Sequence, residues 1–207
     1  MTTGVLAKVL PKAITNRKKS KQELSAEEAN FLIWNTSLGR EKLESQYQTF
    51  MSNHANGQMS KKSFNKMMKE SYPGVKTKKL SRHVFRMYDT NGDGAVDFKE
   101  FVVALDVFAN GTPEQNLKQI FRVLDINNDG KIHVMELIEV VRDIFELAKQ
   151  QNPTNSENWD TLAGAAFAEM DLNADGEITE EEFTTACMKQ KKFSTIVTLH
   201  IIDFLNN

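Results

Sequence analysis

The twelve residues Asp89-Thr-Asn-Gly-Asp-Gly-Ala-Val-Asp-Phe-Lys-Glu100 place oxygen-bearing groups at regular intervals. In a loop of this length, positions 1, 3, 5, 7 and 12 supply the oxygens that surround one calcium ion. Those positions are occupied by Asp89, Asn91, Asp93, Ala95 through its backbone carbonyl, and Glu100. Asp97 at position 9 can hold a water ligand, and Gly94 at position 6 permits the sharp turn. The run therefore predicts a calcium site.

The same pattern recurs twice, in residues 125–136 and 171–182. Each run repeats the acids, the central glycine and the terminal glutamate at the same offsets. The predicted ligands are Asp125, Asn127, Asp129, Lys131 through its carbonyl, and Glu136 in the first run, and Asp171, Asn173, Asp175, Glu177 through its carbonyl, and Glu182 in the second. Apolar residues recur at helical spacing on both sides of every loop. These runs predict three helix–loop–helix units of the EF-hand type and three bound Ca2+ ions.

A fourth, altered loop precedes these three at residues 52–63. Gly57 at position 6 and Met59 at position 8 keep the frame of the motif. Positions 1, 3, 5 and 12 are neutral, because they hold Ser52, His54, Asn56 and Ser63. No carboxylate at these positions can neutralise the ion, so we expect this loop to be silent toward calcium.

Loops that start at residues 52, 89, 125 and 171 form two pairs, and we expect an all-α fold with two lobes. Within each pair the residues at position 8 should form a short β-ladder, Met59 with Val96 and Ile132 with Ile178. A capping box begins at Ser25, and Thr112 is the expected N-cap of a helix that starts with a proline. The expected divisions are a basic tail at 1–24, an N-terminal lobe at 25–109, a C-terminal lobe at 110–192, and an apolar segment at 193–207 that forms an extra C-terminal helix.

Composition limits the class of protein and its location. The chain has 207 residues, of which 40% are hydrophobic and 26% charged, which suits one or two compact domains. A net charge of −2 gives no general attraction to nucleic acid. Cys187 is the only cysteine, so an internal disulfide is impossible and a reducing compartment is favoured. We see neither a signal peptide nor an apolar run that could span a bilayer, and expect a cytoplasmic protein.

The two ends of the chain leave alternatives open. Residues 2–22 carry only basic charges, which fits a mobile tail or a segment that touches an anionic membrane weakly and in a salt-sensitive way. Thr2 replaces the glycine that N-myristoylation requires, so we expect no acyl chain. Residues 193–205 are too apolar for a solvated tail, and form either a core helix or a plug in a binding groove.

Residues 43–188 resemble the neuronal calcium sensor family, of the recoverin, visinin-like and frequenin type. The resemblance rests on Tyr-Gln-Thr-Phe at 47–50, His-Val-Phe-Arg at 83–86, Asp-Phe-Lys-Glu-Phe-Val-Val-Ala-Leu at 97–105 and Ile-Phe-Arg-Val-Leu-Asp at 120–125. It implies that calcium exposes an apolar groove for an amphipathic helix of a partner protein. His54-Ala55 replaces the Cys-Pro pair usual in the first loop, and Thr2 the myristoylated glycine, so a myristoyl switch is not implied. A divergent relative at the membrane periphery or in cilia also fits.

Other classes of protein share some of these features. A passive calcium buffer would use every one of the ligands, but would not expose apolar surface. An enzyme is not expected, because the histidines are dispersed and no common catalytic motif appears. A calcium-triggered photoprotein is disfavoured because its silent hand is usually the second. Residues that could line a groove or fill the core of the N-terminal lobe are Leu43, Tyr47, Phe50, Phe64, Met67, Met68, Phe85, Phe101, Leu105 and Phe108.

Overall fold

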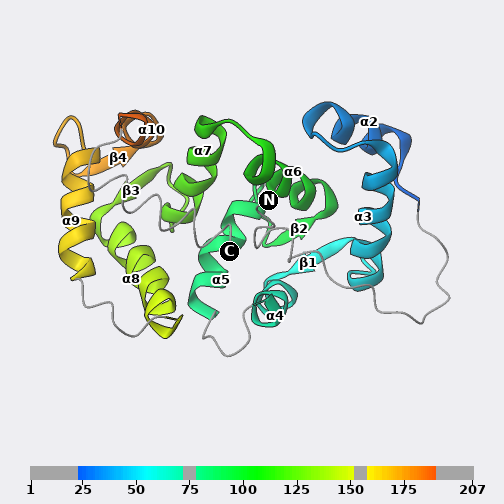
Figure 1. Cartoon of the computed structure of the whole chain (residues 1–207), viewed down its shortest axis with the longest axis horizontal. Coiled ribbons are helices and arrows are strands. Elements are labelled where there is room, and N and C mark those ends of the chain that lie inside the picture. Colours follow the sequence, from blue (N-terminus) through cyan, green and yellow to red (C-terminus); the bar gives the residue numbers. More distant parts are fainter. Residues whose placement is uncertain (1–22, 72–77, 152–157, 190–207) are drawn as a thin grey trace.

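The computed structural model describes residues 23–71, 78–151 and 158–189, which form an elongated, mostly helical molecule (Figure 1). The helices are α2 (Ala26–Asn35), α3 (Arg40–Asn53), α4 (Lys61–Ser71), α5 (Lys78–Tyr88), α6 (Phe98–Asn110), α7 (Pro113–Leu124), α8 (Val134–Gln151), α9 (Trp159–Met170) and α10 (Glu180–Met188). The strands are β1 (Gln58–Ser60), β2 (Ala95–Asp97), β3 (Lys131–His133) and β4 (Glu177–Thr179). The predicted all-α class is confirmed.

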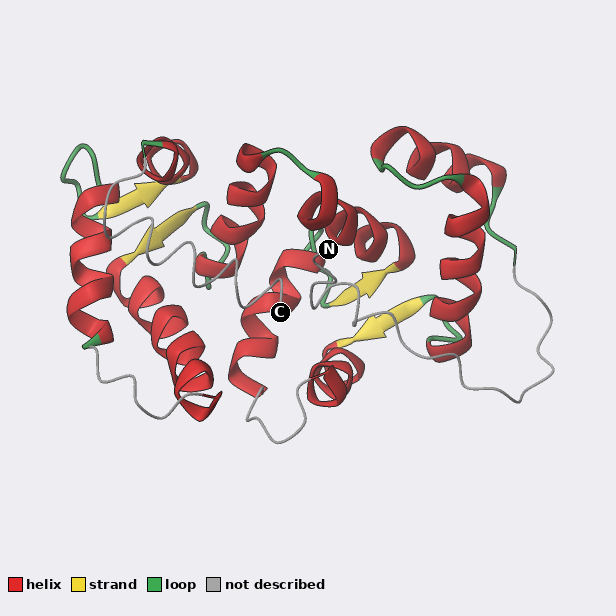
Figure 2. Ribbon diagram, in the orientation of Figure 1, coloured by secondary structure: helices red, strands yellow, loops and turns green. Residues whose placement is uncertain are grey.

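Each short strand lies inside a helix–loop–helix unit, and the strands pair in two ladders (Figure 2). Hand 1 is α3–β1–α4, hand 2 is α5–β2–α6, hand 3 is α7–β3–α8 and hand 4 is α9–β4–α10. In the antiparallel ladders Met59 faces Val96 and Ile132 faces Ile178, as predicted, and all four side chains are fully buried. Hand 1 therefore keeps its structural partnership with hand 2 despite its neutral loop.

Side-chain caps fix where several helices begin. The hydroxyl of Ser25 accepts a hydrogen bond from the Glu28 N–H at the start of α2. Thr112 and Gln115 form a reciprocal capping box at the start of α7, with Pro113 at the first helical position. Such contacts satisfy N–H groups that have no partner within the helix. Both predicted starts are confirmed, and a Cβ at the adjoining Gly111 would clash with the Val107 carbonyl oxygen.

Aromatic side chains fill the core between hands 1 and 2. The ring of Phe101 lies 5.5 Å from that of Phe50 and 5.8 Å from that of Tyr88, measured between centroids. Of the residues expected to line a groove or fill the core, seven are buried and three are partly buried. The buried ones are Leu43, Phe50, Phe64, Met68, Phe85, Phe101 and Phe108, and the partly buried ones are Tyr47, Met67 and Leu105. In this conformation they form core.

Helix α5 links the two pairs of hands at the centre of the molecule (Figure 1). It belongs to hand 2 but packs against α7 and α8 of hand 3. Buried apolar residues form one cluster that includes members of all four hands. Hands 1 and 4 lie at opposite ends of the molecule, and contacts of α5 and α6 with hand 3 join the N-terminal pair to the C-terminal pair.

Three sequence-based expectations concern segments at the edge of the described residues. The polar run at 149–158, which includes Pro153, predicts an extended connection, but this prediction is wrong at its start, because α8 continues helically to Gln151. The basic tail and the apolar segment at 193–205 lie outside the described residues, so the extra C-terminal helix stays a prediction. Within 23–71, 78–151 and 158–189, no helix has both the length and the apolar character to cross a membrane.

We predict that Phe101→Ala lowers the free energy of unfolding by about 3–5 kcal/mol, because it removes a ring that is 2% exposed and leaves a cavity. Trp34→Ala is the matched control, since its side chain is 87% exposed, and it should change stability by less than about 0.5 kcal/mol. Urea unfolding without calcium measures both. Equal losses would contradict the description of this core.

Candidate calcium-binding loops

The three acidic loops share a backbone shape that the neutral loop adopts only in part. At position 6 all four loops have a glycine with positive φ, at +85° for Gly94. Position 4 is also left-handed in the three acidic loops, at Gly92, Asn128 and Ala174. Among the described residues, Ala55 at the same position of residues 52–63 has no such φ. The acidic loops thus adopt one common turn geometry, which hand 1 follows only at its glycine.

Backbone N–H groups orient the side chains at positions 1, 3 and 5. In hand 2, Asn91 Oδ1 accepts from the Asp93 N–H at 2.8 Å, and Asp93 Oδ1 accepts from the Ala95 N–H at 2.8 Å. Asp89 Oδ2 accepts from the Gly94 N–H at 3.0 Å. Hands 3 and 4 repeat these contacts with their own residues. Each loop therefore orients its side chains at positions 1, 3 and 5 through hydrogen bonds to its own backbone.

The glutamate at position 12 fastens the start of each loop to its outgoing helix. Glu100 Oε1 accepts from the N–H groups of Thr90 and Asn91 at 3.0 and 3.2 Å. Its other oxygen accepts from the Asp97 N–H at 3.1 Å, and Asp97 in turn caps α6. Glu136 makes the same contacts at both ends of its loop. A shift of this carboxylate would therefore be transmitted to the helix that carries it.

The donor set fits calcium. Glu100 and Asp125 are buried acids, and Asp89 Oδ1 is a buried oxygen without a hydrogen-bond partner. Burial raises the pKa of Asp89, and the charges of Glu100 and Asp93 raise it further. Burial also raises the pKa of Asp125. A bound cation would offset both the desolvation and the repulsion, and a shell made only of oxygens suits a hard ion.

Side chains at positions 7 and 9 connect the loops of hands 3 and 4, which the sequence did not indicate. Lys131 and Glu177 form an ion pair across the β3–β4 ladder. His133 Nδ1 lies 3.2 Å from Glu136 Oε2, and its Nε2 lies 3.5 Å from Glu177 Oε1. The bond to Glu136 raises the pKa of His133. The sequence predicted that the residues at position 7 contribute only their carbonyl groups, so it did not predict the ion pair between the side chains of Lys131 and Glu177.

The loop of hand 1 is held by neutral groups. Ser52 donates to the Thr49 carbonyl, and Ser60 accepts from the Ser63 N–H. The ring of His54 packs against Phe50, with centroids 4.8 Å apart, and burial lowers the pKa of that histidine. The positions that hold acidic ligands in the other three loops are therefore occupied here by neutral residues.

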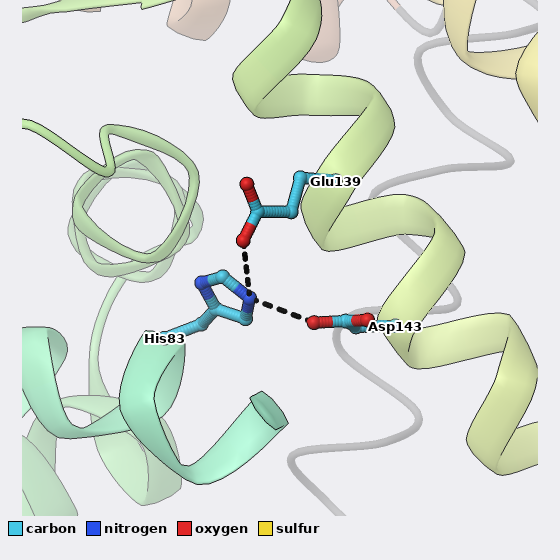
Figure 3. Close-up of side chains that lie close together, drawn as sticks. All are labelled: His83, Glu139 and Asp143. Atoms are coloured by element: carbon cyan, nitrogen blue, oxygen red, sulfur yellow. Dashed lines mark hydrogen bonds and ion pairs between the residues drawn. The ribbon is translucent and has the colours of Figure 1, made fainter. Parts of the chain in front are cut away.

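A cluster that the sequence did not reveal lies between the two pairs of hands (Figure 3). The ring of His83, from α5, points between Glu139 and Asp143, which both project from α8. Its Nε2 lies 3.0 Å from Asp143 Oδ2 and 3.9 Å from Glu139 Oε1. These residues are about sixty positions apart in the chain, so local spacing gives no sign of their contact.

Comparison with known proteins agrees with this geometry. Residues 77–142 and 114–188 match the family model of an EF-hand domain pair. Neuronal calcium sensor 1 of Lymnaea stagnalis is 30% identical over 183 residues, which is 87% of this chain and 96% of that protein. Human recoverin is 29% identical over 178 residues, covering 84% and 89% of the two chains. Human guanylyl cyclase-activating protein 3 is 31% identical over 160 residues, covering 77% and 74%.

The loops, the ladders and the matched family model define an EF-hand calcium-binding protein. Within that class, the chain belongs to the neuronal calcium sensor family. The resemblance inferred from the sequence runs is confirmed.

We predict that Gly94→Ala destabilises the protein by about 1–2 kcal/mol, because a Cβ is unfavourable at its φ of +85° although no atom crowds the site. Gly164→Ala is the matched control. It lies within α9 in open space, so alanine should stabilise the helix by about 0.5–1 kcal/mol. Opposite signs in calcium-free denaturation support the assigned loop geometry, and equal signs argue against it.

Proposed function

We propose that this protein is a calcium sensor that binds three Ca2+ ions, one in each loop of hands 2, 3 and 4. The observation that carries the proposal is the oxygen-lined geometry of these loops, in which a glutamate joins the start of the loop to the outgoing helix. The proposed ligands are those predicted from the sequence: Asp89, Asn91, Asp93, Ala95, Glu100, Asp125, Asn127, Asp129, Lys131, Glu136, Asp171, Asn173, Asp175, Glu177 and Glu182. Hand 1 serves as the structural partner of hand 2.

The proposed response to calcium is a movement of helices that opens apolar surface. Each position-12 glutamate is the third residue of its outgoing helix, as Glu100 is in α6. If both of its oxygens bound the ion, they would give up hydrogen bonds from backbone N–H groups of the loop. The outgoing helix that carries the glutamate would then move with it. Core residues between hands 1 and 2 would then become accessible, and an amphipathic helix of a partner protein could bind there.

The protein's effect is proposed to be exerted on a partner rather than through catalysis. A relative is named for activating guanylyl cyclase, and is thus a regulator of a separate enzyme. We infer that this protein also regulates a partner. We further infer that it is cytoplasmic and has two lobes, residues 25–109 and 110–192. Membrane contact through the basic residues before α2 would be weak and reduced by salt, since the charge term is about 1 kcal/mol per cation.

Calorimetric titration tests the stoichiometry. We predict three ions with dissociation constants on the order of 10⁻⁷ to 10⁻⁵ M. Glu100→Gln, Glu136→Gln and Glu182→Gln should each remove one ion, because a neutral amide cannot clasp the ion with two anionic oxygens. Glu181→Gln is the control, since this exposed neighbour of Glu182 stands at position 11. A fourth ion, or the loss of none in a loop variant, would refute the assignment.

Calcium-dependent exposure of apolar surface separates a sensor from a buffer. We predict that an apolar fluorescent dye binds more strongly when calcium is added, because a sensor opens while a buffer barely moves. The triple variant of Glu100, Glu136 and Glu182 to Gln should show no increase. If the intact protein binds three ions and dye fluorescence does not rise, the protein is a buffer and the sensing part of the proposal fails.

A further inference from the structure

His83 makes contacts through both ring nitrogens where hand 2 meets hand 3. Figure 3 draws those of Nε2 with Asp143 and Glu139. Its Nε2 lies 3.0 Å from Asp143 Oδ2, and its Nδ1 lies 3.0 Å from a terminal nitrogen of Arg86. The side chains of His83 and Asp143 are only 2% and 5% exposed. Arg86 also donates to the Val123 carbonyl of α7, at 2.6 Å. Helix α5 is therefore joined to both helices of hand 3.

The partners of His83 determine its protonation state. A guanidinium group has donors and no acceptor, so Nδ1 of His83 must accept a hydrogen bond from Arg86. The ring is then neutral, its proton is on Nε2, and this N–H donates to the carboxylate of Asp143. A second proton on Nδ1 would face the guanidinium and remove the bond that it makes. The same guanidinium has a buried Nε–H without a hydrogen-bond partner, so loss of the bond to His83 would add to a donor that is already unsatisfied.

The cluster is poorly suited to a metal ion, although ligand atoms of His83, Glu139 and Asp143 all lie within 4.8 Å of one another. A metal would need the lone pair of Nε2, which would place the ring proton on Nδ1. Histidine ligands normally donate that proton to an acceptor, whereas here it would meet Arg86. Lys79 Nζ also lies 3.3 Å from Asp143 Oδ1, where it competes with a cation. The network therefore favours a neutral, hydrogen-bonded ring.

Charged groups from α5 and α8 shift the pKa of His83 in opposite directions. Burial lowers the pKa of His83 most, and the charge of Arg86 lowers it further. The hydrogen bond to Asp143 and the charges of Asp143 and Glu139 raise the pKa, but the net direction is downward. Below the ordinary pKa of about 6.5 the unfolded chain thus binds more protons than the folded one. The stability contributed by the neutral ring is present above that pH and is lost as the pH falls toward the lowered pKa.

The position of this network relates it to two calcium loops. His83 lies less than two helical turns before Asp89, the first predicted ligand of hand 2. Asp143 lies about two turns after Glu136, the last predicted ligand of hand 3. A change in the angle between α7 and α8 would strain the Arg86–Val123 and His83–Asp143 bonds, because both start on α5 and end on different helices, and a movement of α5 would relieve that strain. Because α5 carries the start of the hand 2 loop, its movement alters that loop.

We propose that His83, Asp143 and Arg86 form a latch that makes the calcium sites of hands 2 and 3 respond together while His83 is neutral, and that protonation of His83 opens the latch. The inference rests on the proposed calcium binding of these two hands. It adds two states, a closed one with the neutral ring bonded on both sides and an open one with a protonated ring exposed to water. Calcium and protons then act on the same contact between the lobes.

Coupling between the two sites is the first test. The affinity of the hand 2 loop is measured by calorimetry at about pH 7.5, above the histidine range, with hand 3 intact and with Glu136→Gln. We expect the two affinities to differ by about five-fold or more in the otherwise unaltered chain. With Asp143→Ala the difference should fall below about two-fold. Asp143→Asn should restore it, since its amide oxygen can still accept from Nε2. An unchanged difference in Asp143→Ala overturns the latch.

A matched control separates the latch from a general effect on α8. Asp160→Ala removes the exposed ion pair between Arg142 of α8 and Asp160 of α9, which joins the two hands of the C-terminal pair. It should leave the coupling between hands 2 and 3 as it is in the unaltered chain. If Asp160→Ala abolished the coupling as fully as Asp143→Ala, the effect would not belong to the latch.

Proton dependence is the second test, and its first part needs no calcium. NMR titration of the His83 ring should give a pKa below about 6.5, and Arg86→Gln should raise it, because an amide oxygen can accept the second ring proton. His83→Gln keeps a neutral donor for Asp143, so its coupling should be equal above and below the pKa that this titration gives for His83, whereas the unaltered chain should lose coupling below that pKa. A pKa at or above 6.5 overturns the proposal. If hands 2 and 3 bind no calcium, the proposed function fails, while the titration still tests the latch geometry.

Discussion

The carboxylate at position 12 of each complete loop is the contact on which the other features depend. Glu100 accepts hydrogen bonds from the start of its loop and, through the Asp97 N–H, from the end. It thereby completes the capping box of α6 and joins both ends of the loop to that helix. The same oxygens are the ones that an ion would require. An ion bound by these oxygens would compete with the backbone N–H groups that they now accept from, and this competition would give calcium a mechanical effect.

Pairing of hands explains why an altered loop persists. The N–H and C=O groups of β2 need a partner strand, and β1 supplies it regardless of the charges in residues 52–63. Met59 and Val96 are then buried together, and the aromatic core of Phe50, Tyr88 and Phe101 closes beneath them. Hand 1 is retained because hand 2 requires its backbone. Acidic ligands are dispensable for that purpose, since the pairing of β1 with β2 uses backbone groups.

Many local features could be predicted from the sequence because each depends on residues a few positions apart. The caps at Ser25 and Thr112 follow from hydrogen bonding within single motifs. The β-ladders join different hands, but their register follows from the equivalent position 8 that each loop contributes. The connection after α8 was misjudged at its start, since helix propagation to Gln151 outweighed the polar composition. The Lys131–Glu177 pair was missed because position 7 was assigned its carbonyl alone.

The sequence by itself determined the hands, their pairing and the candidate calcium ligands, because a twelve-residue loop contains every one of its own ligands. Only the tertiary structure decided how the two pairs meet. The bond between His83 and Asp143 joins residues about sixty positions apart, and it exists because α5 packs against α7 and α8. The protonation state of His83 likewise depends on Arg86 and on burial, which no local pattern specifies. Ligand spacing is a property of the chain, whereas the contact between the two pairs of hands is a property of the packed helices.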